Sequence, residues 1–121
     1  MDKSKETKVI LKLTKDTINN EVDWSIGSKN FVLGGEEEII DNVYETEYFG
    51  KNLRLYHYRD KYYHDYLEYV WQDGYRLEVV DDNRNSLWIF PSDQAIYGLY
   101  DTVREKTSSI KDYLNDILGN E

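Results

Sequence analysis

The chain has 121 residues, a formal net charge of −9, no Cys and 18 aromatic residues, of which twelve are Tyr. This length favours one domain, and the aromatic content predicts a folded core rather than a disordered chain. The negative charge argues against direct binding of a nucleic-acid backbone. No apolar run is long enough for a membrane span or a signal peptide. The lack of Cys excludes disulfides and fits a cytoplasmic location.

The first twenty residues differ in charge from the rest of the chain. They carry a net charge of +2 from five Lys and three acidic side chains, whereas residues 21–121 carry −11. Four of the Lys recur at helical spacing, which predicts a basic N-terminal helix within residues 1–20, capped by Ser4. A strand with Val9, Leu11 and Leu13 facing inward is the competing interpretation. Such a row of Lys is usually a solvated face, and the alternative is a grip on a phosphate or an acidic surface; the row is Lys5, Lys8, Lys12 and Lys15.

Residues 21–91 contain six or seven candidate strands and are predicted to form an antiparallel meander of about six strands. Short apolar and aromatic runs alternate with turn residues, as is typical of strands joined by tight connections. Asp73-Gly74 is the strongest hairpin signal, and Gly34-Gly35 followed by three Glu predicts a loop. The expected strands are 22–26, 30–33, 43–49, 53–58, 66–71, 75–80 and 87–90.

Helices are predicted in residues 92–119, after Pro91. Ser92 is the expected cap of the first, Ser108 or Ser109 that of the second, and Gly119 the stop. Apolar residues recur at helical spacing in both segments. The whole pattern predicts a single α+β domain over residues 1–121, with an N-terminal helix, an antiparallel sheet, and C-terminal helices packed on one sheet face.

Large side chains fall on both faces of the predicted strands. Val43, Leu55 and Leu77 are expected under the helices, and the residues that alternate with them are mainly aromatic. Three structural explanations are open: Tyr tolerates a wet face, the N-terminal helix covers that face, or the sheet closes into a small barrel. The functional alternative is a partner-binding surface, because Tyr and Trp bury large areas with few rotatable bonds. Its candidate residues are Tyr44, Tyr48, Tyr56, Tyr58 and Trp88.

Both histidines lie in one charged, tyrosine-rich stretch. His57 and His64, with Asp60 between them, could hold a metal ion or serve as a general base. A solvated loop between two strands is the expected structure instead, and no HExxH-type motif fixes the spacing. We therefore expect no catalytic residue, no metal site and no cofactor. A small-molecule binder or an enzyme around His57 and His64 stays open as an alternative.

The strongest negative stretch follows the Gly34-Gly35 pair. A solvated loop and sheet edge is the structural interpretation. The functional one is mimicry of a phosphate backbone, which would make the protein an acidic inhibitor, from a phage or mobile element, of a nucleic-acid-binding protein. The stretch comprises Glu36, Glu37, Glu38, Asp41, Glu45 and Glu47.

Residues 22–118 resemble a type of small, uncharacterised bacterial protein that is also encoded by mobile elements. The resemblance is carried by Trp24, Leu53-Arg54-Leu55, the run from Tyr75 to Asp81, and the segment from Leu99 to Arg104. It implies a lead helix, an antiparallel sheet and a C-terminal helix, and it brings no activity with it. The favoured function is a non-catalytic interaction protein of the bacterial cytoplasm that uses its tyrosine-rich sheet face to self-associate or to dock a protein partner.

Overall fold

The computed structural model describes residues 4–31, 33 and 36–119. Helix α1 (Lys5–Ile18) precedes a five-stranded sheet, and helices α2 (Gln94–Ser108) and α3 (Ile110–Leu118) follow it. The strands are β1 (Ser25–Gly27), β2 (Glu38–Tyr48), β3 (Lys51–Tyr63), β4 (Tyr69–Val80) and β5 (Ser86–Ile89). All neighbours pair antiparallel in chain order, so the predicted α+β meander is confirmed with five strands instead of six.

The N-terminal segment is a helix, as expected. The Ser4 side chain accepts a hydrogen bond from the Thr7 amide and so caps the first turn. Ile10 and Leu13 are fully buried, and Thr17 is buried one turn later, which gives α1 a single inward face at helical spacing. The four Lys lie on its exposed side.

Two predicted hairpins are not where the turn residues placed them. Residues 22–26 and 30–33 do not pair with each other; β1 pairs with β2 instead, and Val32 lies outside the described residues. Asp73 and Gly74 lie inside β4, paired with Arg59 and Tyr58. The real β3–β4 connection is the five-residue segment 64–68, so the stretch expected to be a loop after His57 is instead the outer half of β3.

The turn between β2 and β3 is formed by two residues, Phe49 and Gly50. Tyr48 pairs directly with Lys51, and both intervening residues have positive φ, of 49° and 80°. Positive φ at both central positions is the type I′ geometry that matches the twist of a hairpin.

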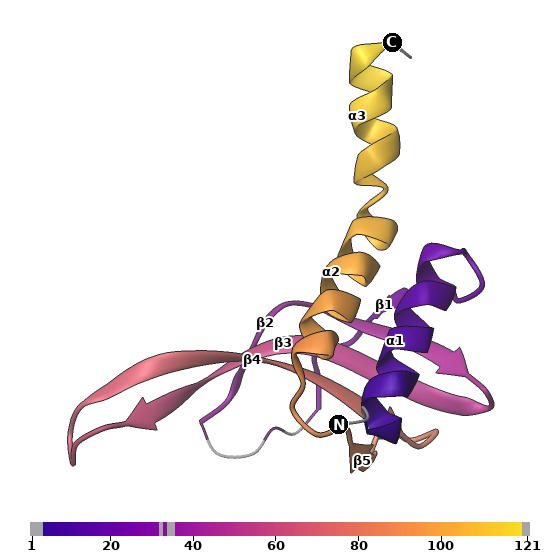
Figure 1. Cartoon of the computed structure of the whole chain (residues 1–121). Helices are drawn as coiled ribbons and strands as arrows, with labels where there is room; N and C mark the ends of the chain where they lie inside the picture. The colour runs from indigo at the N-terminus through magenta and orange to yellow at the C-terminus, as the bar shows by residue number, and fades with distance from the viewer. Residues whose placement is uncertain (1–3, 32, 34–35, 120–121) are drawn as a thin grey trace.

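Helices α1 and α2 cover one face of the sheet, and α3 continues away from it (Figure 1). The N-cap of α2 is Asp93, whose side chain accepts from the Ala95 amide, and not Ser92 as predicted. Asp93 also accepts a hydrogen bond from Thr7, which joins the start of α1 to the start of α2. Ser109 adopts the left-handed conformation between α2 and α3, and no residue of α3 is buried.

The main core lies between the two helices and the sheet. Its strand residues alternate along β3 and β4, with Leu55 opposite Leu77 and Leu53 opposite Val79. Together they form one apolar cluster with α1 and α2. Its buried members are Ile10, Leu13, Val22, Tyr44, Leu53, Leu55, Leu77, Phe90, Ile96, Leu99, Tyr100 and Val103.

The opposite sheet face carries a second, polar layer. Arg54 and Glu78 form an ion pair at 3.2 Å, and each side chain is only 3% exposed. The Phe31 ring stacks on the Arg54 guanidinium, with 3.8 Å between the ring centroid and the guanidinium carbon. Arg76 pairs with Glu37 at 2.7 Å. The segment between β1 and β2 therefore covers the central part of this face, where Arg54, Tyr56 and Glu78 are buried.

Candidate functional site

The outer halves of β3 and β4 form a two-stranded ribbon that extends beyond the helices (Figure 1). We call this ribbon the arm and define it as residues 59–73. Its strands remain paired to the end, from Arg59 opposite Asp73 to Tyr63 opposite Tyr69. An isolated two-stranded ribbon is marginally stable in water. The arm therefore depends on its own side-chain contacts or on a further partner.

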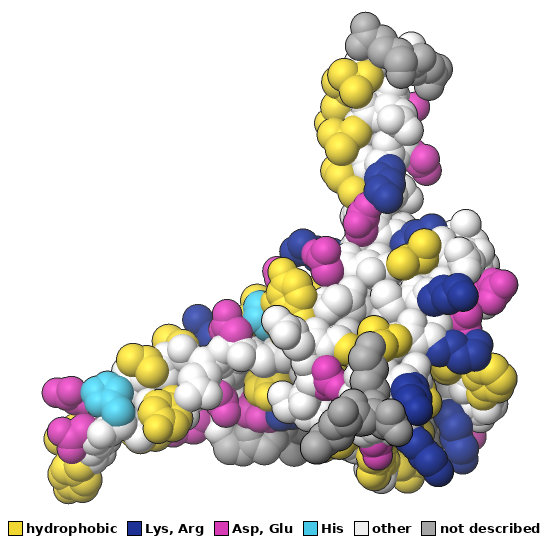
Figure 2. Space-filling view, viewed as in Figure 1, with side chains coloured by type: hydrophobic (Ala, Val, Ile, Leu, Met, Phe, Trp, Pro, Cys, Tyr) yellow, Lys and Arg dark blue, Asp and Glu magenta, His cyan; other side chains and the backbone are white. Residues whose placement is uncertain are grey.

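Large apolar side chains cover the arm, in contrast to a sheet surface that simply faces water. Tyr66 at the tip is 87% exposed, and Leu67 beside it is 79% exposed. Figure 2 shows hydrophobic side chains scattered along this ribbon among acidic ones. Contiguous exposed apolar patches, rather than single scattered residues, mark interaction sites, and Tyr63, Tyr69 and Trp71 are in ring contact on one face of the arm. The exposed apolar residues of the arm are Tyr62, Tyr63, Tyr66, Leu67, Tyr69, Val70 and Trp71.

One face of the arm holds cations against aromatic rings. The Arg59 guanidinium carbon lies 4.2 Å from the Trp71 ring centroid, and Lys61 Nζ lies 4.6 Å from that of Tyr69. Tyr63 and Tyr69, directly opposite each other, have ring centroids 5.5 Å apart. Cation–π and aromatic cross-strand pairs of this kind each contribute about 0.5–1 kcal/mol at exposed sites. They hold the aromatic side chains in a defined arrangement.

Acidic side chains at the start of β2 and just before it contact the side chains of the outer half of β3. The Tyr63 hydroxyl donates to Glu36 at 2.9 Å, and this hydrogen bond raises the pKa of Tyr63. Lys61 lies 3.6 Å from the same carboxylate, and Arg59 donates to Glu38 at 2.8 Å. The β3 side of the arm is therefore occupied by side chains of the same chain.

The outer edge of β4 has no such cover in the described structure. Strand β5 pairs with β4 only from Glu78 to Val80, and one further hydrogen bond runs from the Phe90 amide to the Leu77 carbonyl. No described strand pairs with β4 on this side between Tyr69 and Tyr75. The arm thus combines exposed aromatic side chains with an open sheet edge.

The five predicted surface residues do not form one surface. Tyr44 pairs with Leu55 and is 2% exposed in the core under the helices, with its ring 5.6 Å from that of Tyr100. Tyr48 lies on the same side, and its hydroxyl donates to Asp16 of α1 at 2.7 Å. The prediction that these two residues face away from the helices is wrong. Both faces of β2 are buried here, so the apolar pattern could not determine which face is which.

The other three predicted residues are also divided. Tyr56 does lie on the face opposite the helices, but it is 1% exposed beneath Phe31. Tyr58 is half-buried on the same face. Trp88 pairs with Val79 and so lies on the helix side, where it is 45% exposed. Its face could not be predicted, because the apolar run of β5 has no alternating polar residues. Tyr44 and Tyr56 thus contribute to the fold, and exposed aromatic area is found on the arm instead.

The two histidines are not brought together. His57 stacks on Tyr75 at the base of the arm, with 4.5 Å between ring centroids and an interplanar angle of 12°. His64 lies seven residues further on, at the tip, and the strand rise places the two roughly 20 Å apart. Figure 2 shows the histidines as two separate patches. The described residues contain no group of three His or acidic side chains suited to a metal ion.

Most of the acidic stretch is paired within the chain. Glu36, Glu37, Glu38 and Glu45 each bind a cationic side chain, and only Asp41 and Glu47 have no cation partner among the described residues. Glu45 pairs with Arg84, which also donates to the Ser28 carbonyl at 2.8 Å. These ion pairs fix the β1–β2 segment and leave little free negative charge in the stretch.

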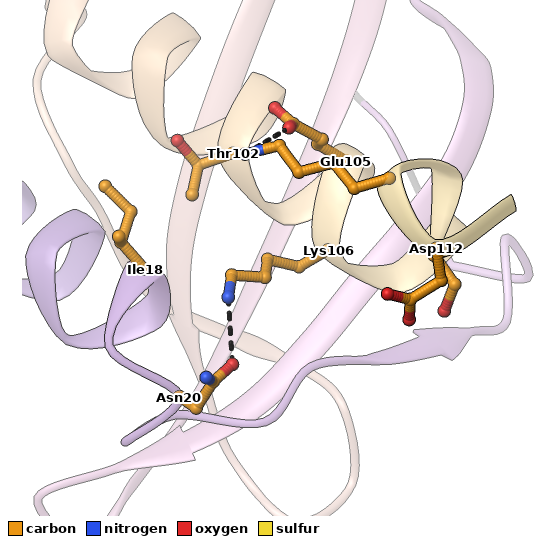
Figure 3. Close-up of a pocket in the computed structure, with 8 residues that line it drawn as sticks. Ile18, Asn20, Thr102, Glu105, Lys106 and Asp112 are labelled. Atoms are coloured by element: carbon orange, nitrogen blue, oxygen red, sulfur yellow. Dashed lines mark hydrogen bonds and ion pairs between the residues drawn. The ribbon is translucent and has the colours of Figure 1, made fainter. Parts of the chain in front are cut away.

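A cleft with a volume of about 600 Å³ lies at the junction of α1, α2 and α3 (Figure 3). Lys106 crosses it to donate to Asn20 at 2.9 Å, and Lys111 pairs with Glu105 at 3.0 Å. The close-up shows polar side chains from the two helix ends pointing toward one another across the opening. Since both amines are engaged and no His lines it, the cleft has the character of a solvated helix junction.

Sequence reasoning placed the aromatic residues of the arm around a charged loop and did not select them as a surface. No Gly, Pro or Asn occurs in residues 59–68, so turn composition does not separate the end of β3 from the β3–β4 turn, where the Asp65 side chain accepts a hydrogen bond from the Tyr66 amide. The Asp-Gly signal at residues 73–74 led to the wrong prediction of where β3 and β4 are joined.

None of the described helices combines the length and apolar character needed to cross a membrane. Comparisons of the chain with protein-family models, with curated proteins and with solved structures found no match. The resemblance to small bacterial and mobile-element proteins therefore stays a prediction, and the site is interpreted from its own geometry.

Proposed function

We propose that the protein is a non-catalytic interaction protein of the bacterial cytoplasm and that the arm is its binding surface. The observation that carries the proposal is the concentration of exposed aromatic side chains on a ribbon that extends beyond the core. The proposal keeps the function expected from the sequence and moves its surface from the sheet face to the arm.

The aromatic side chains of the arm have the properties of interface residues. Trp, Tyr and Arg dominate the energetics of protein interfaces, and the arm combines all three in contact, with Arg59 over Trp71 and Lys61 between Trp71 and Tyr69. Because the cations already order these rings, docking requires little further loss of side-chain freedom.

The acidic-inhibitor alternative has less support. A phosphate mimic needs free carboxylates, and four of the six candidates are bound to cations of the same chain. The enzyme alternative lacks a constellation, because His57 and His64 lie at opposite ends of the arm. Neither alternative is favoured by a specific contact.

Site-specific photo-cross-linking in cells tests the proposal. A photoreactive phenylalanine analogue replaces Tyr66 or Trp71 of the arm, and Phe49 serves as the matched control because it is 81% exposed on the β2–β3 turn at the other end of the sheet. We expect covalent protein adducts, identified by mass spectrometry, from the two arm positions and not from Phe49. Equal adduct formation at all three positions, or none on the arm, would overturn the proposal.

A further inference from the structure

We infer that the partner of the arm is a second copy of this chain, joined through antiparallel pairing of the free edges of the two β4 strands. This inference rests on the proposed function, since it names the partner of the same arm.

The backbone groups that face outward can be assigned from one hydrogen bond. The Phe90 amide donates to the Leu77 carbonyl, so Leu77 directs its backbone groups away from β3. Successive residues of a strand alternate in this direction, and the β3–β4 register shows no bulge between Tyr69 and Leu77. The residues that present amides and carbonyls at the free edge are therefore Tyr69, Trp71, Asp73 and Tyr75.

This edge lacks the features that normally prevent sheet edges from pairing. Edges are usually protected by short strands, Lys, Pro, bulges or a covering segment. The edge strands β1 and β5 have three and four residues, and the β3 side of the arm pairs with β2 as far as Arg59 and carries Lys61, ion-paired with Glu36, beyond it. The β4 segment from Tyr69 to Tyr75 has neither Lys nor Pro and is rich in residues with high strand propensity.

Only one register pairs this whole segment with itself. A two-fold axis perpendicular to the sheet pairs residues on the same face, and full overlap of 69–75 places Gln72 opposite Gln72 of the second copy. Tyr69 then faces Tyr75, and Trp71 faces Asp73, so all four outward residues form hydrogen-bonded pairs. Pairing cannot extend further at either end. At one end β5 and Phe90 already occupy the edge from Leu77 onward, and at the other β4 begins at Tyr69, next to the tip.

Charge and shape support this register over its neighbours. It places Glu68 opposite Arg76 of the second copy, a cation that also pairs with Glu37 of its own chain. It places Val70 opposite Gly74, above which the Tyr58 ring offers an apolar contact. Shifting the axis by one residue toward the base would put Asp73 opposite Asp73, a destabilising like-charge pair. Shifting the axis by one residue toward the tip would place Tyr75 opposite residue 67 of the second copy, which lies in the tip and outside β4. Paired as inferred, the two sheets join into one of ten strands with both pairs of helices on the same face.

The chain offers a direct test because it contains no Cys. Gln72 is exposed, and in this register it forms a non-hydrogen-bonded pair with its own copy, with Cα atoms about 4.5 Å apart, within disulfide reach. We expect Gln72→Cys to form a covalent dimer under mild oxidation. The matched control is Val70→Cys on the same face, whose two Cα atoms would lie roughly 13 Å apart, and it should stay monomeric on a denaturing gel.

A second variant separates loss of pairing from loss of fold. Asp73→Pro removes an outward amide at a position where an edge strand tolerates Pro. We expect an unchanged circular dichroism spectrum and self-association weakened by about tenfold or more, because each dimer loses two hydrogen bonds, as measured by sedimentation equilibrium.

The outcomes distinguish this inference from the proposed function. A wild-type chain that sediments as a monomer at its highest soluble concentration, or a dimer that Gln72→Cys does not link while Val70→Cys does, overturns the β4 pairing. If the arm positions also cross-link to a different protein in cells, the proposed function survives without the inference. If they cross-link to nothing, both fail.

Discussion

The Tyr58 ring lies over Gly74 across the β3–β4 pair. A Cβ atom built on Gly74 would lie 2.5 Å from both Cζ and the hydroxyl oxygen of Tyr58, closer than any side chain tolerates. Tyr58 in turn stacks with Arg76, with 4.2 Å between its ring centroid and the guanidinium carbon. Gly74 is therefore inside a strand because a ring occupies the space above it, at the base of the arm.

This contact predicts that Gly74→Ala destabilises the protein. The new methyl group would displace the Tyr58 ring from Arg76, and overpacking of this kind costs about 1–3 kcal/mol. Gly98→Ala is the matched control, because nothing lies within 4 Å of a Cβ there and helix α2 should gain about 0.5–1 kcal/mol. Urea unfolding measures both. Equal changes in the free energy of unfolding would contradict the account.

The same contact explains why the hairpin predicted at Asp73-Gly74 is wrong. Asp-Gly is a strong turn signal between apolar runs, and nothing local indicates that a Tyr sixteen positions earlier needs the space above that Gly. Helices α1 and α2 and the order of the strands could be predicted, because helical spacing and alternation are local properties. The phase of β2 and the site on the arm could not, since they depend on what covers each face.

A buried hydroxyl without a partner predicts a stabilising substitution. Among the described residues the Tyr100 hydroxyl accepts and donates no hydrogen bond, whereas Tyr56 accepts one from Arg76 at 3.1 Å. Tyr100→Phe should therefore raise the free energy of unfolding by about 1 kcal/mol, and Tyr56→Phe should lower it by a similar amount. Thermal unfolding compares the two. Destabilisation by Tyr100→Phe would show that its hydroxyl is satisfied.

Tyr100 also predicts a change at alkaline pH. Burial, assisted by nearby Tyr44 and Asp41, raises the pKa of Tyr100 from 10 to about 12. The stabilisation that this raised pKa gives to the folded state is fully present below pH 10. It is lost as the pH rises toward 12, because the unfolded chain releases the Tyr100 proton first. We expect Tyr100→Phe to unfold less steeply than wild type between these pH values. An identical pH profile would contradict the assignment.

The buried ion pair predicts sensitivity to acid. Burial alone would raise the pKa of Glu78, but hydrogen bonds from Ser86, Tyr56 and Arg54, with the Arg54 charge, outweigh it and hold that pKa below its usual 4.5. The stabilisation is therefore present above pH 4.5 and lost as the pH falls through the lowered value.

Glu78→Gln tests this interpretation. Leaving Arg54 buried and unpaired should cost about 3–5 kcal/mol at neutral pH, and the dependence of stability on pH below 4.5 should become shallower. Arg54→Met with Glu78→Leu is the control, because removing both charges should recover much of the loss. A double variant no more stable than Glu78→Gln would mean that the pair itself is not the cause.

Helix α3 is predicted to be dispensable for folding. None of its residues is buried, and Figure 2 shows its apolar side chains as a stripe open to solvent. Ending the chain after Ser109 should change the free energy of unfolding by about 0.5 kcal/mol or less. Leu99→Ala, at a fully buried position of α2, should cost about 2–5 kcal/mol by the same urea titration. A large loss on truncation would show that α3 supports the core.

Amide hydrogen exchange along β4 tests the pairing of the arm most directly. In a lone arm, the amides of Tyr69, Trp71, Asp73 and Tyr75 face solvent and exchange quickly, whereas those of Val70, Gln72 and Gly74 bond to β3 and exchange slowly. Pairing of two copies predicts that the first set becomes protected as protein concentration rises, so that the alternation disappears. Alternation that persists at every concentration would contradict it.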